Sequence, residues 1–237
     1  MKKESTSAKA PADKQTKDES KKDRKPLRQK GGMYFHCGAI IGRKNVFVTD
    51  QYIDLLVNAF KATELKKDVK NLAFVVMPNY FYWIFRLSEN KDNPVEIYGE
   101  LKGDVAKAIL ETLQEESKGE AHQLADLFKD NERVGRTTAE RLIWTFEEYG
   151  KQFETSKRYK VWTPKTEIRL IDTDEILQQK LTVIKKAPTL ERWQMAKKSE
   201  DYPYLYIADE LQEIDTNKLK IADFLPIINI ESSQVTA

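Results

Sequence analysis

Residues 75–87 constrain the fold of this chain more than any other stretch. Two short apolar segments, residues 75–77 and 80–87, are joined there by Pro78-Asn79. Proline fixes φ and asparagine tolerates the left-handed region, so this dipeptide favours a turn. The segments are rich in aromatic and β-branched residues, which favours strands, and we predict a central β-hairpin. Because strand side chains alternate, Tyr80 and Tyr82 share one face of its second strand, which we expect to matter for function.

Periodic apolar patterns on both sides of the hairpin predict the remaining elements. A helix is expected after Asp50, a second from Pro94 to about residue 113, and another over residues 173–186 with Thr173 or Asp172 as its cap. The other predictions are a strand over residues 34–41, a polar loop over 117–137, a short helix near 142–149 and extended segments over 159–171.

The resulting order is strand–helix–strand–strand–helix–strand, which is the split βαβ, ferredoxin-like plan. We therefore predict an α+β fold with helices on one face of a sheet and with helical insertions. In that plan the other sheet face stays available for a ligand or partner.

The charge of the chain is divided unevenly along its 237 residues. Residues 1–32 hold nine Lys and two Arg against five acids, a net charge of +6, so the remaining chain has −4 of the total of +2. The first segment has too little apolar surface to fold alone, and we predict a disordered basic tail over 1–32, a folded domain over 33–210 and a partly disordered extension over 211–237. The tail is either a solvated segment or a nucleic-acid-binding arm.

Composition also excludes several classes of protein. The single cysteine, Cys37, leaves no internal disulfide and no cysteine set for a metal, which fits a reducing, cytoplasmic compartment. No apolar run is long enough to span a membrane, and the N-terminus lacks a secretory signal.

Several segments resemble the REP-associated, single-tyrosine, HUH-type transposases. In that family the equivalent hairpin reads Met-Pro-Asn-His-hydrophobic-His, which residues 77–82 resemble as Met-Pro-Asn-Tyr-Phe-Tyr. The resemblance covers about residues 33–210; its other parts are residues 33–49, Tyr159-Lys160-Val161-Trp162, residues 176–188 and Glu200-Asp201-Tyr202-Pro203-Tyr204.

The resemblance implies metal-assisted transesterification of single-stranded DNA. In the family, two histidines and a further polar group bind Mg²⁺ or Mn²⁺, and a tyrosine on the following helix is the nucleophile. Here Tyr80 and Tyr82 occupy the histidine positions, and neutral phenols are poor ligands for a hard cation. Asp104 occupies the tyrosine position. We therefore predict no metal or other cofactor and no catalytic residue. His36 and His122, the only histidines, are too scattered to restore the pair.

Three functions stay open on the sequence alone. The leading hypothesis is a domesticated, catalytically inactive protein that binds single-stranded or hairpin nucleic acid or has a regulatory role. The second is an assembly subunit whose former DNA face binds a protein, and the third is an active transposase with relocated residues, with Tyr98 as nucleophile. A homodimer is also considered, because family members commonly form dimers. The expected binding face comprises Tyr80, Tyr82, Lys102, Lys107, Lys185 and Lys186.

Two of these assignments have a simpler alternative. Tyr80 and Tyr82 are either a stacking platform for bases or packing residues in a former metal site. Lys185 and Lys186, with Arg192, Lys197 and Lys198, either contact phosphates or are simply solvated. His36 is expected to be a core histidine.

Overall fold

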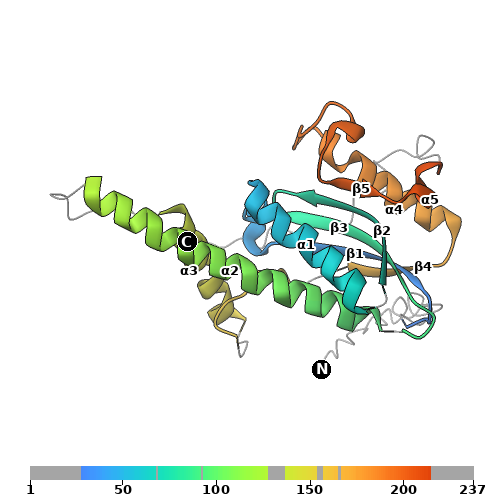
Figure 1. Cartoon of the computed structure of the whole chain (residues 1–237), viewed down its shortest axis with the longest axis horizontal. Coiled ribbons are helices and arrows are strands. Elements are labelled where there is room, and N and C mark those ends of the chain that lie inside the picture. The colour runs from blue at the N-terminus through green and yellow to red at the C-terminus, as the bar shows by residue number, and fades with distance from the viewer. Residues whose placement is uncertain are drawn as a thin grey trace, which may run out of the picture.

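A five-stranded antiparallel sheet forms the centre of the molecule in this computed structural model (Figure 1). The structure describes residues 28–67, 69–91, 93–127, 137–153, 157–164 and 167–214. The strand order is β4-β1-β3-β2-β5. The first four strands have the order of the split βαβ plan, so the predicted α+β, ferredoxin-like fold is confirmed, and β5 extends the sheet beyond β2. The strands are β1 (Met33–Ala39), β2 (Val69–Met77), β3 (Tyr80–Leu87), β4 (Glu167–Ile171) and β5 (Leu205–Ile207).

Helices lie on both faces of this sheet (Figure 1). Helices α1 (Asp50–Lys67) and α2 (Pro94–Leu127) pack against one face, and α3 (Thr138–Gln152) packs beside α2. Helix α4 (Asp174–Lys186) packs on the opposite face, and the short α5 (Asp209–Gln212) follows β5. None of the described helices has the length and apolar character needed to cross a lipid bilayer.

The predicted hairpin is β2–β3, and its second strand is buried on both sides. Phe81, Trp83 and Phe85 face α1 and α2, while Tyr80, Tyr82 and Ile84 face α4. All six are at most 5% exposed. A strand covered on both faces must be apolar at every position rather than at alternate positions, which explains the nearly continuous apolar run of residues 80–87.

The expectation that the second sheet face stays open is wrong. Leu177, Leu181 and Ile184 form an apolar stripe on α4, and this stripe is buried against β2 and β3. The chain after α4 extends the cover, because the Tyr202 hydroxyl donates a hydrogen bond to the carbonyl of Val76 over 2.7 Å. An amphipathic helix must bury its apolar stripe, and this sheet face is where α4 does so.

Of two predictions about helix ends, one is confirmed and the other is partly wrong. The predicted N-cap of α4 is confirmed, because the Thr173 side chain accepts a hydrogen bond from the backbone N–H of Ile176. The predicted loop over residues 117–137 is wrong for its first part, because α2 continues to Leu127 and passes well beyond the sheet (Figure 1). Residues 111–127 contain many good helix formers and no proline, so the single Gly119 does not end the helix.

The predicted tail and C-terminal extension lie mostly outside the described residues. Residues 1–27 and 215–237, which hold most of the predicted tail and extension, are outside that part of the chain. Residues 28–32 are described, and the backbone N–H of Gly31 donates to the carbonyl of Ser88.

A buried polar network connects the hairpin to α1. The indole N–H of Trp83 donates to Oδ1 of Asn71 over 2.8 Å, and Nδ2 of Asn71 donates to the carbonyl of Phe60 over 3.0 Å. The ladder between β2 and β3 is irregular between Asn71 and Ala73. Because buried donors need acceptors, Asn71 fixes the position of the Trp83 ring relative to α1.

We expect Asn71→Ala to lower the free energy of unfolding by about 2–3 kcal/mol, because it leaves the buried Trp83 N–H without an acceptor. Urea denaturation followed by tryptophan fluorescence measures this change. Asn58→Ala, at an exposed position of α1, is the control and should change stability by less than about 0.5 kcal/mol. Equal effects of the two substitutions would contradict the role given to Asn71.

Candidate nucleic-acid interface

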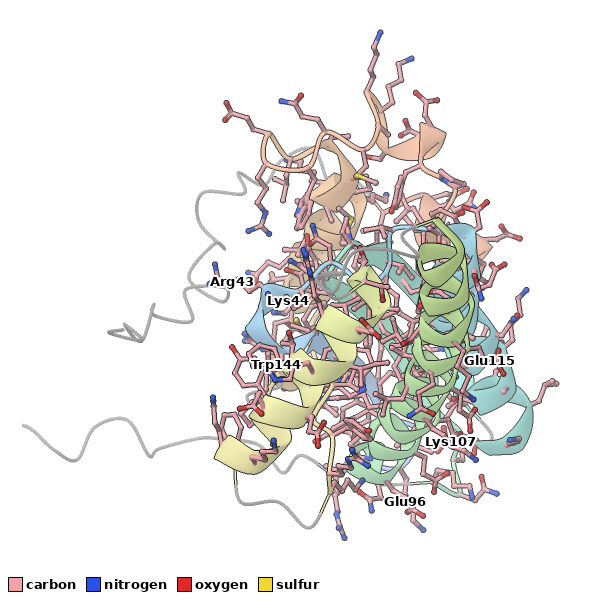
Figure 2. All side chains as sticks on the ribbon, turned by 90° about the vertical axis from the view of Figure 1, so that its left-hand side faces the viewer. Arg43, Lys44, Glu96, Lys107, Glu115 and Trp144 are labelled. Atoms are coloured by element: carbon pink, nitrogen blue, oxygen red, sulfur yellow. The ribbon has the colours of Figure 1, made fainter. Side chains whose placement is uncertain are left out.

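A basic groove lies between α2 and residues 157–164, and we call it the α2 groove. It has a volume of about 690 Å³. Lys102 and Lys107, both predicted site residues, line its α2 side, and Figure 2 labels Lys107 on α2. Residues 157–164 bring further cations and aromatic rings to the opposite side. The charged and aromatic residues of the groove are Lys102, Lys107, Lys157, Arg158, Lys160, Glu111, Tyr98, Tyr159 and Trp162.

Backbone hydrogen bonds hold residues 157–164 in place. The N–H of Ile41 donates to the carbonyl of Val161, and the N–H of Thr163 donates to the carbonyl of Ala39, at 2.8 and 2.9 Å. These bonds attach the segment to the end of β1. The N–H of Lys160 also donates to the carbonyl of Phe146 in α3 over 2.9 Å. The groove wall therefore has the sheet and α3 as fixed supports.

Glycine at position 150 permits this close approach to α3. A Cβ atom at that position would lie only 2.2 Å from the carbonyl oxygen of Arg158. That oxygen belongs to the backbone, so it cannot move aside as a flexible side chain would. The absence of a side chain at Gly150 therefore decides how near the groove wall lies to α3.

Trp162 forms the floor of the α2 groove. Its indole N–H donates to the backbone carbonyl of Lys102 over 2.8 Å, and its ring packs edge-on against Phe81 at a centroid distance of 5.6 Å. The ring is 8% exposed. Trp162 therefore joins the groove rigidly to the core, while the half-buried rings of Tyr98 and Tyr159 are more accessible.

The cations of the groove lie beside aromatic rings. Lys102 Nζ is 5.5 Å from the centre of the Trp162 ring, and the Arg158 guanidinium is 5.1 Å from the centre of Tyr159. Burial lowers the pKa of Lys102 to about 8, with a smaller lowering by the charge of Lys160. Two acids offset part of the charge: Glu111 pairs with Lys107 at 3.8 Å and Glu147 with Arg158 at 3.2 Å.

His36 lies beneath the groove in the core, as predicted. Its ring stacks on Tyr98 at a centroid distance of 4.4 Å, and its side chain is fully buried. Nδ1 lies 3.1 Å from the backbone carbonyl of Glu167 and therefore holds the proton, because a carbonyl only accepts. Burial, with a smaller contribution from the charge of Lys102, lowers the pKa of His36 to about 3. The imidazole is thus neutral at physiological pH.

Tyr80 and Tyr82 are buried on the other face of the sheet, 5% and 4% exposed. Their ring centroids are 4.9 Å apart, and Phe35 and Trp193 pack against them. Burial raises the pKa of both phenols, so both stay protonated at neutral pH. An open stacking platform at these two rings, one of the predicted alternatives, is wrong in this structure, because α4 and the chain that follows it occupy the face.

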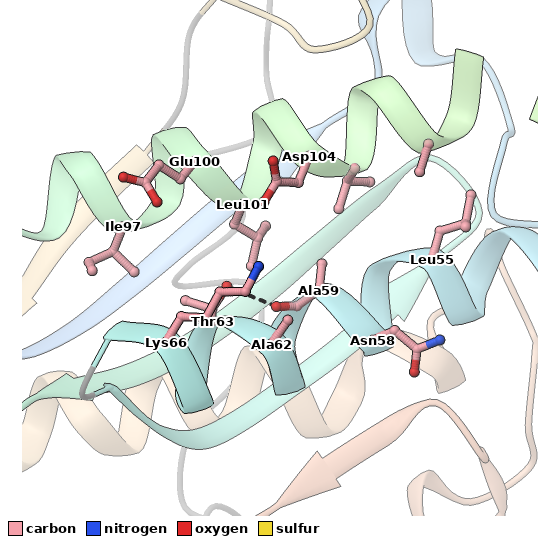
Figure 3. A pocket seen from close by; sticks show the side chains of 12 residues that line it. Leu55, Asn58, Ala59, Ala62, Thr63, Lys66, Ile97, Glu100, Leu101 and Asp104 are labelled. Atoms are coloured by element: carbon pink, nitrogen blue, oxygen red, sulfur yellow. Dashed lines mark hydrogen bonds between the residues drawn. The ribbon is translucent and has the colours of Figure 1, made fainter. Parts of the chain in front are cut away.

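Asp104 is not brought together with the two tyrosines. It lies on α2, whose buried neighbours Leu101 and Val105 pack on the opposite sheet face from Tyr80 and Tyr82. Asp104 lines a cleft of about 240 Å³ between α1 and α2, where Figure 3 shows it on the α2 wall together with Glu100. Lys66 of α1 also lines the cleft. This cleft is apolar at its base and has mainly acidic charge, so it does not suit a phosphate backbone.

Lys185 and Lys186 are also separated from the α2 groove, since they end α4 on the opposite face. Lys185 Nζ donates to the backbone carbonyl of Ile214 over 3.4 Å. The predicted set of site residues therefore divides into three places: the groove, the buried tyrosine pair and the end of α4.

The tyrosine positions do not fit the divalent metal that the family resemblance implies. Both phenols are protonated, and their burial leaves them without the carboxylate or imidazole partners that hard cations need. Within the described ranges, no group of three or more His, Cys, Asp and Glu side chains is placed to hold a metal ion. The side chain of His122 lies outside the described residues.

Five charged or aromatic residues on one wall of the groove were not predicted as site residues, although residues 157–162 read Lys-Arg-Tyr-Lys-Val-Trp. They are Lys157, Arg158, Tyr159, Lys160 and Trp162. Alternation of cations and aromatic rings is typical of single-stranded nucleic-acid sites, so the signal was present in the sequence. Only the fold places this segment opposite Lys102 and Lys107.

Comparisons with known proteins add a structural likeness. No protein-family model matches the sequence, and no curated protein matches it either. Among solved structures, the chain is similar to a REP-associated tyrosine transposase bound to a REP hairpin. The two share 16% sequence identity with a TM-score of 0.48, over 77% of this chain and 81% of the other.

We expect the neutral, buried His36 to make stability depend on pH. Its pKa is about 3 when folded and near 6.5 when unfolded, so the unfolded state binds more protons between these values. The stabilisation is complete above pH 6.5 and is lost as pH falls toward 3, with a slope of up to about 1.4 kcal/mol per pH unit.

Urea denaturation from pH 7 to pH 4 measures this slope in wild type and in His36→Asn, whose amide nitrogen can replace Nδ1 as donor. Carboxylates titrate in both proteins, so the difference between the two slopes isolates His36. Equal slopes would show that His36 is protonated normally in the folded state.

Proposed function

We propose that this protein binds single-stranded or hairpin nucleic acid through the α2 groove and is a catalytically inactive relative of the single-tyrosine HUH transposases. The observation that carries the proposal is the groove itself, in which five cations, three aromatic rings and one acid line a volume of about 690 Å³. The motif resemblance and the split βαβ topology support the proposed ancestry.

The chemistry of the groove suits a flexible nucleic-acid strand. Lysine and arginine side chains neutralise phosphates, and the release of counterions supplies most of the affinity. Exposed tyrosine rings stack on bases without strong sequence preference, at about 1–3 kcal/mol per base. Tyr98 and Tyr159, whose rings are half-buried, lie on the two sides of the groove and would supply this stacking. In a hairpin, the unpaired loop bases would be the ones to reach these rings.

The proposed loss of catalysis follows from residue types and their separation. A metal-directed strand cleavage needs ligands and a nucleophile at one place. The family's ligand positions hold two buried, protonated phenols, and the nucleophile position holds Asp104 on the far side of the sheet. Tyr98, the alternative nucleophile, stacks on the buried His36.

We expect the triple variant Lys107→Gln, Lys157→Gln, Lys160→Gln to bind a single-stranded oligonucleotide at least about 10-fold more weakly at low salt. Removing three phosphate contacts should also reduce the slope of log K against log salt by about 2, at about 0.7 per contact. Fluorescence anisotropy of a labelled oligonucleotide at several salt concentrations measures both quantities.

The control is Lys61→Gln, Lys66→Gln, Lys70→Gln, which removes the same charge from exposed positions of α1 and β2. It should keep the wild-type salt slope. If wild type shows no salt-dependent binding at micromolar concentration, the proposed function is wrong. If both triple variants lose the same affinity, the contact is not in the α2 groove.

Binding should also weaken as pH rises from 7 to 9. The pKa of Lys102 is about 8, so its ammonium is mostly charged below that pH and mostly neutral above it. With an oligonucleotide of dA and dC, we expect about a several-fold loss of affinity, because one phosphate contact is lost. Lys102→Arg should remove the pH dependence, since guanidinium stays charged throughout. A wild-type profile that stays flat would contradict a contact between Lys102 and phosphate.

Two further experiments separate this proposal from the competing functions. A partner that survives nuclease treatment in a pulldown of the endogenous protein favours an assembly subunit. A covalent protein–DNA adduct in the presence of Mn²⁺, lost in Tyr98→Phe, would establish an active transposase and overturn the proposed loss of catalysis.

A further inference from the structure

A second cluster of hydrogen-bond donors lies on the face of the sheet opposite the α2 groove. It consists of the Tyr80 hydroxyl on β3 and the side chains of Arg192 and Trp193, which follow α4. The Tyr80 and Trp193 ring centroids are 6.0 Å apart. The Arg192 guanidinium carbon lies 5.7 Å from the centre of the Tyr80 ring and 5.6 Å from that of Trp193. The three side chains therefore surround one small region.

Two of these groups are buried polar atoms without a hydrogen-bond partner. The Tyr80 oxygen and the Trp193 Nε1 are both inaccessible to solvent, and neither makes a hydrogen bond of normal geometry. Buried polar atoms are nearly always paired, so two unpaired ones in neighbouring side chains need an explanation. Arg192 and Trp193 nevertheless lie close enough to the Tyr80 hydroxyl to offset part of the rise in its pKa that burial causes. The Arg192 and Trp193 donors therefore both lie beside the Tyr80 oxygen.

The charge of the cluster is positive and unbalanced. Within the described part of the chain, Arg192 has no carboxylate partner, and no carboxylate is among the groups that shift the pKa of Tyr80. Arg192 is exposed, so its guanidinium edge can meet a ligand arriving from solvent. An indole N–H and a guanidinium can only donate hydrogen bonds, and a phenol can donate one as well. Such a set of donors, with the positive charge of Arg192, suits an acceptor with negative charge.

The backbone next to the cluster is held in an unusual conformation. Gln194 has φ of +46°, in the left-handed region that a glutamine rarely adopts. The turn that contains it is tied down, because the N–H groups of Trp193 and Gln194 both donate to the carbonyl of Leu190. Strained backbone of this kind concentrates at ligand sites, where surrounding contacts hold it.

We propose that Tyr80, Arg192 and Trp193 form a binding site for a phosphate-class oxyanion. Three donors arriving from different side chains match a tetrahedral anion with several acceptor oxygens, and arginine is well suited to phosphate. The anion is either free phosphate or the terminal phosphate of a nucleic-acid strand. The site lies on the other face of the sheet from the α2 groove, so it stands independently of the function proposed above.

The ¹⁵N-labelled full chain provides a direct test. The chain has four tryptophans, and the indole N–H signal of Trp193 is identified by its loss in Trp193→Phe. We titrate inorganic phosphate at constant ionic strength, with chloride as the balancing anion. The Trp193 indole signal should shift, and the shift should saturate at phosphate concentrations of about 10 mM or less.

Arg192→Gln should weaken this binding at least about 10-fold, as expected for loss of a charged hydrogen bond. Tyr80→Phe keeps the buried ring and should weaken phosphate binding less than Arg192→Gln does. Arg169→Gln, which removes an exposed arginine from β4, is the charge control and should leave it unchanged. No shift of the Trp193 signal at about 20 mM phosphate, or an equal loss in Arg169→Gln, would overturn the site.

A second titration identifies the source of the anion. If an oligonucleotide with a 5′-phosphate shifts the Trp193 signal and the same strand with a 5′-hydroxyl does not, the ligand is a strand end. If only inorganic phosphate shifts it, the ligand is a free phosphate compound. Both results support the site, and failure of oligonucleotide binding in the α2 groove would leave the phosphate titration unaffected.

Discussion

Burial of β3 on both faces is the constraint on which the rest of this structure depends. Phe81, Trp83 and Phe85 require a cover of helices on one face, which α1 and α2 supply. Tyr80, Tyr82 and Ile84 require a second cover, which α4 and the chain after it supply. At about 25 cal/mol per Å² of buried apolar surface, these aromatic rings are a large part of the driving force for folding. A central strand with two apolar faces therefore determines a three-layer arrangement.

The second cover changes what the hairpin can do. In the plan that the sequence predicted, one face of the sheet was free for a ligand. Here α4 seals that face around the two tyrosines, and the accessible surface with suitable chemistry lies instead along α2. The phenols at positions 80 and 82 are consistent with this arrangement. Buried phenols tolerate an apolar cover, whereas a metal site would need polar partners and access for its substrate.

The α2 groove and the Arg192 cluster share a physical principle. In both, cations lie beside aromatic rings, and the rings are anchored to the core. Trp162 is fixed by its bond to the Lys102 carbonyl, and Tyr80 belongs to the central strand. Anchored rings hold flexible lysine and arginine side chains near defined positions, which reduces the entropy lost when a ligand binds. One ring of each proposed site is linked to β3 on opposite faces of the sheet, because Trp162 packs against Phe81 and Tyr80 lies in the strand.

The sequence by itself determined the hairpin, the alternation of its side chains, the capped helix α4 and the ferredoxin-like order, because these follow from local periodicity and turn chemistry. It also predicted Lys102 and Lys107 as residues of a binding face. Only the tertiary structure decided that residues 157–162 lie opposite those two lysines. No local sequence pattern shows which segments far apart along the chain become neighbours. The sequence likewise did not determine whether Tyr80 and Tyr82 are buried. Alternation shows that the two rings share a face, but whether that face meets solvent depends on where α4 packs.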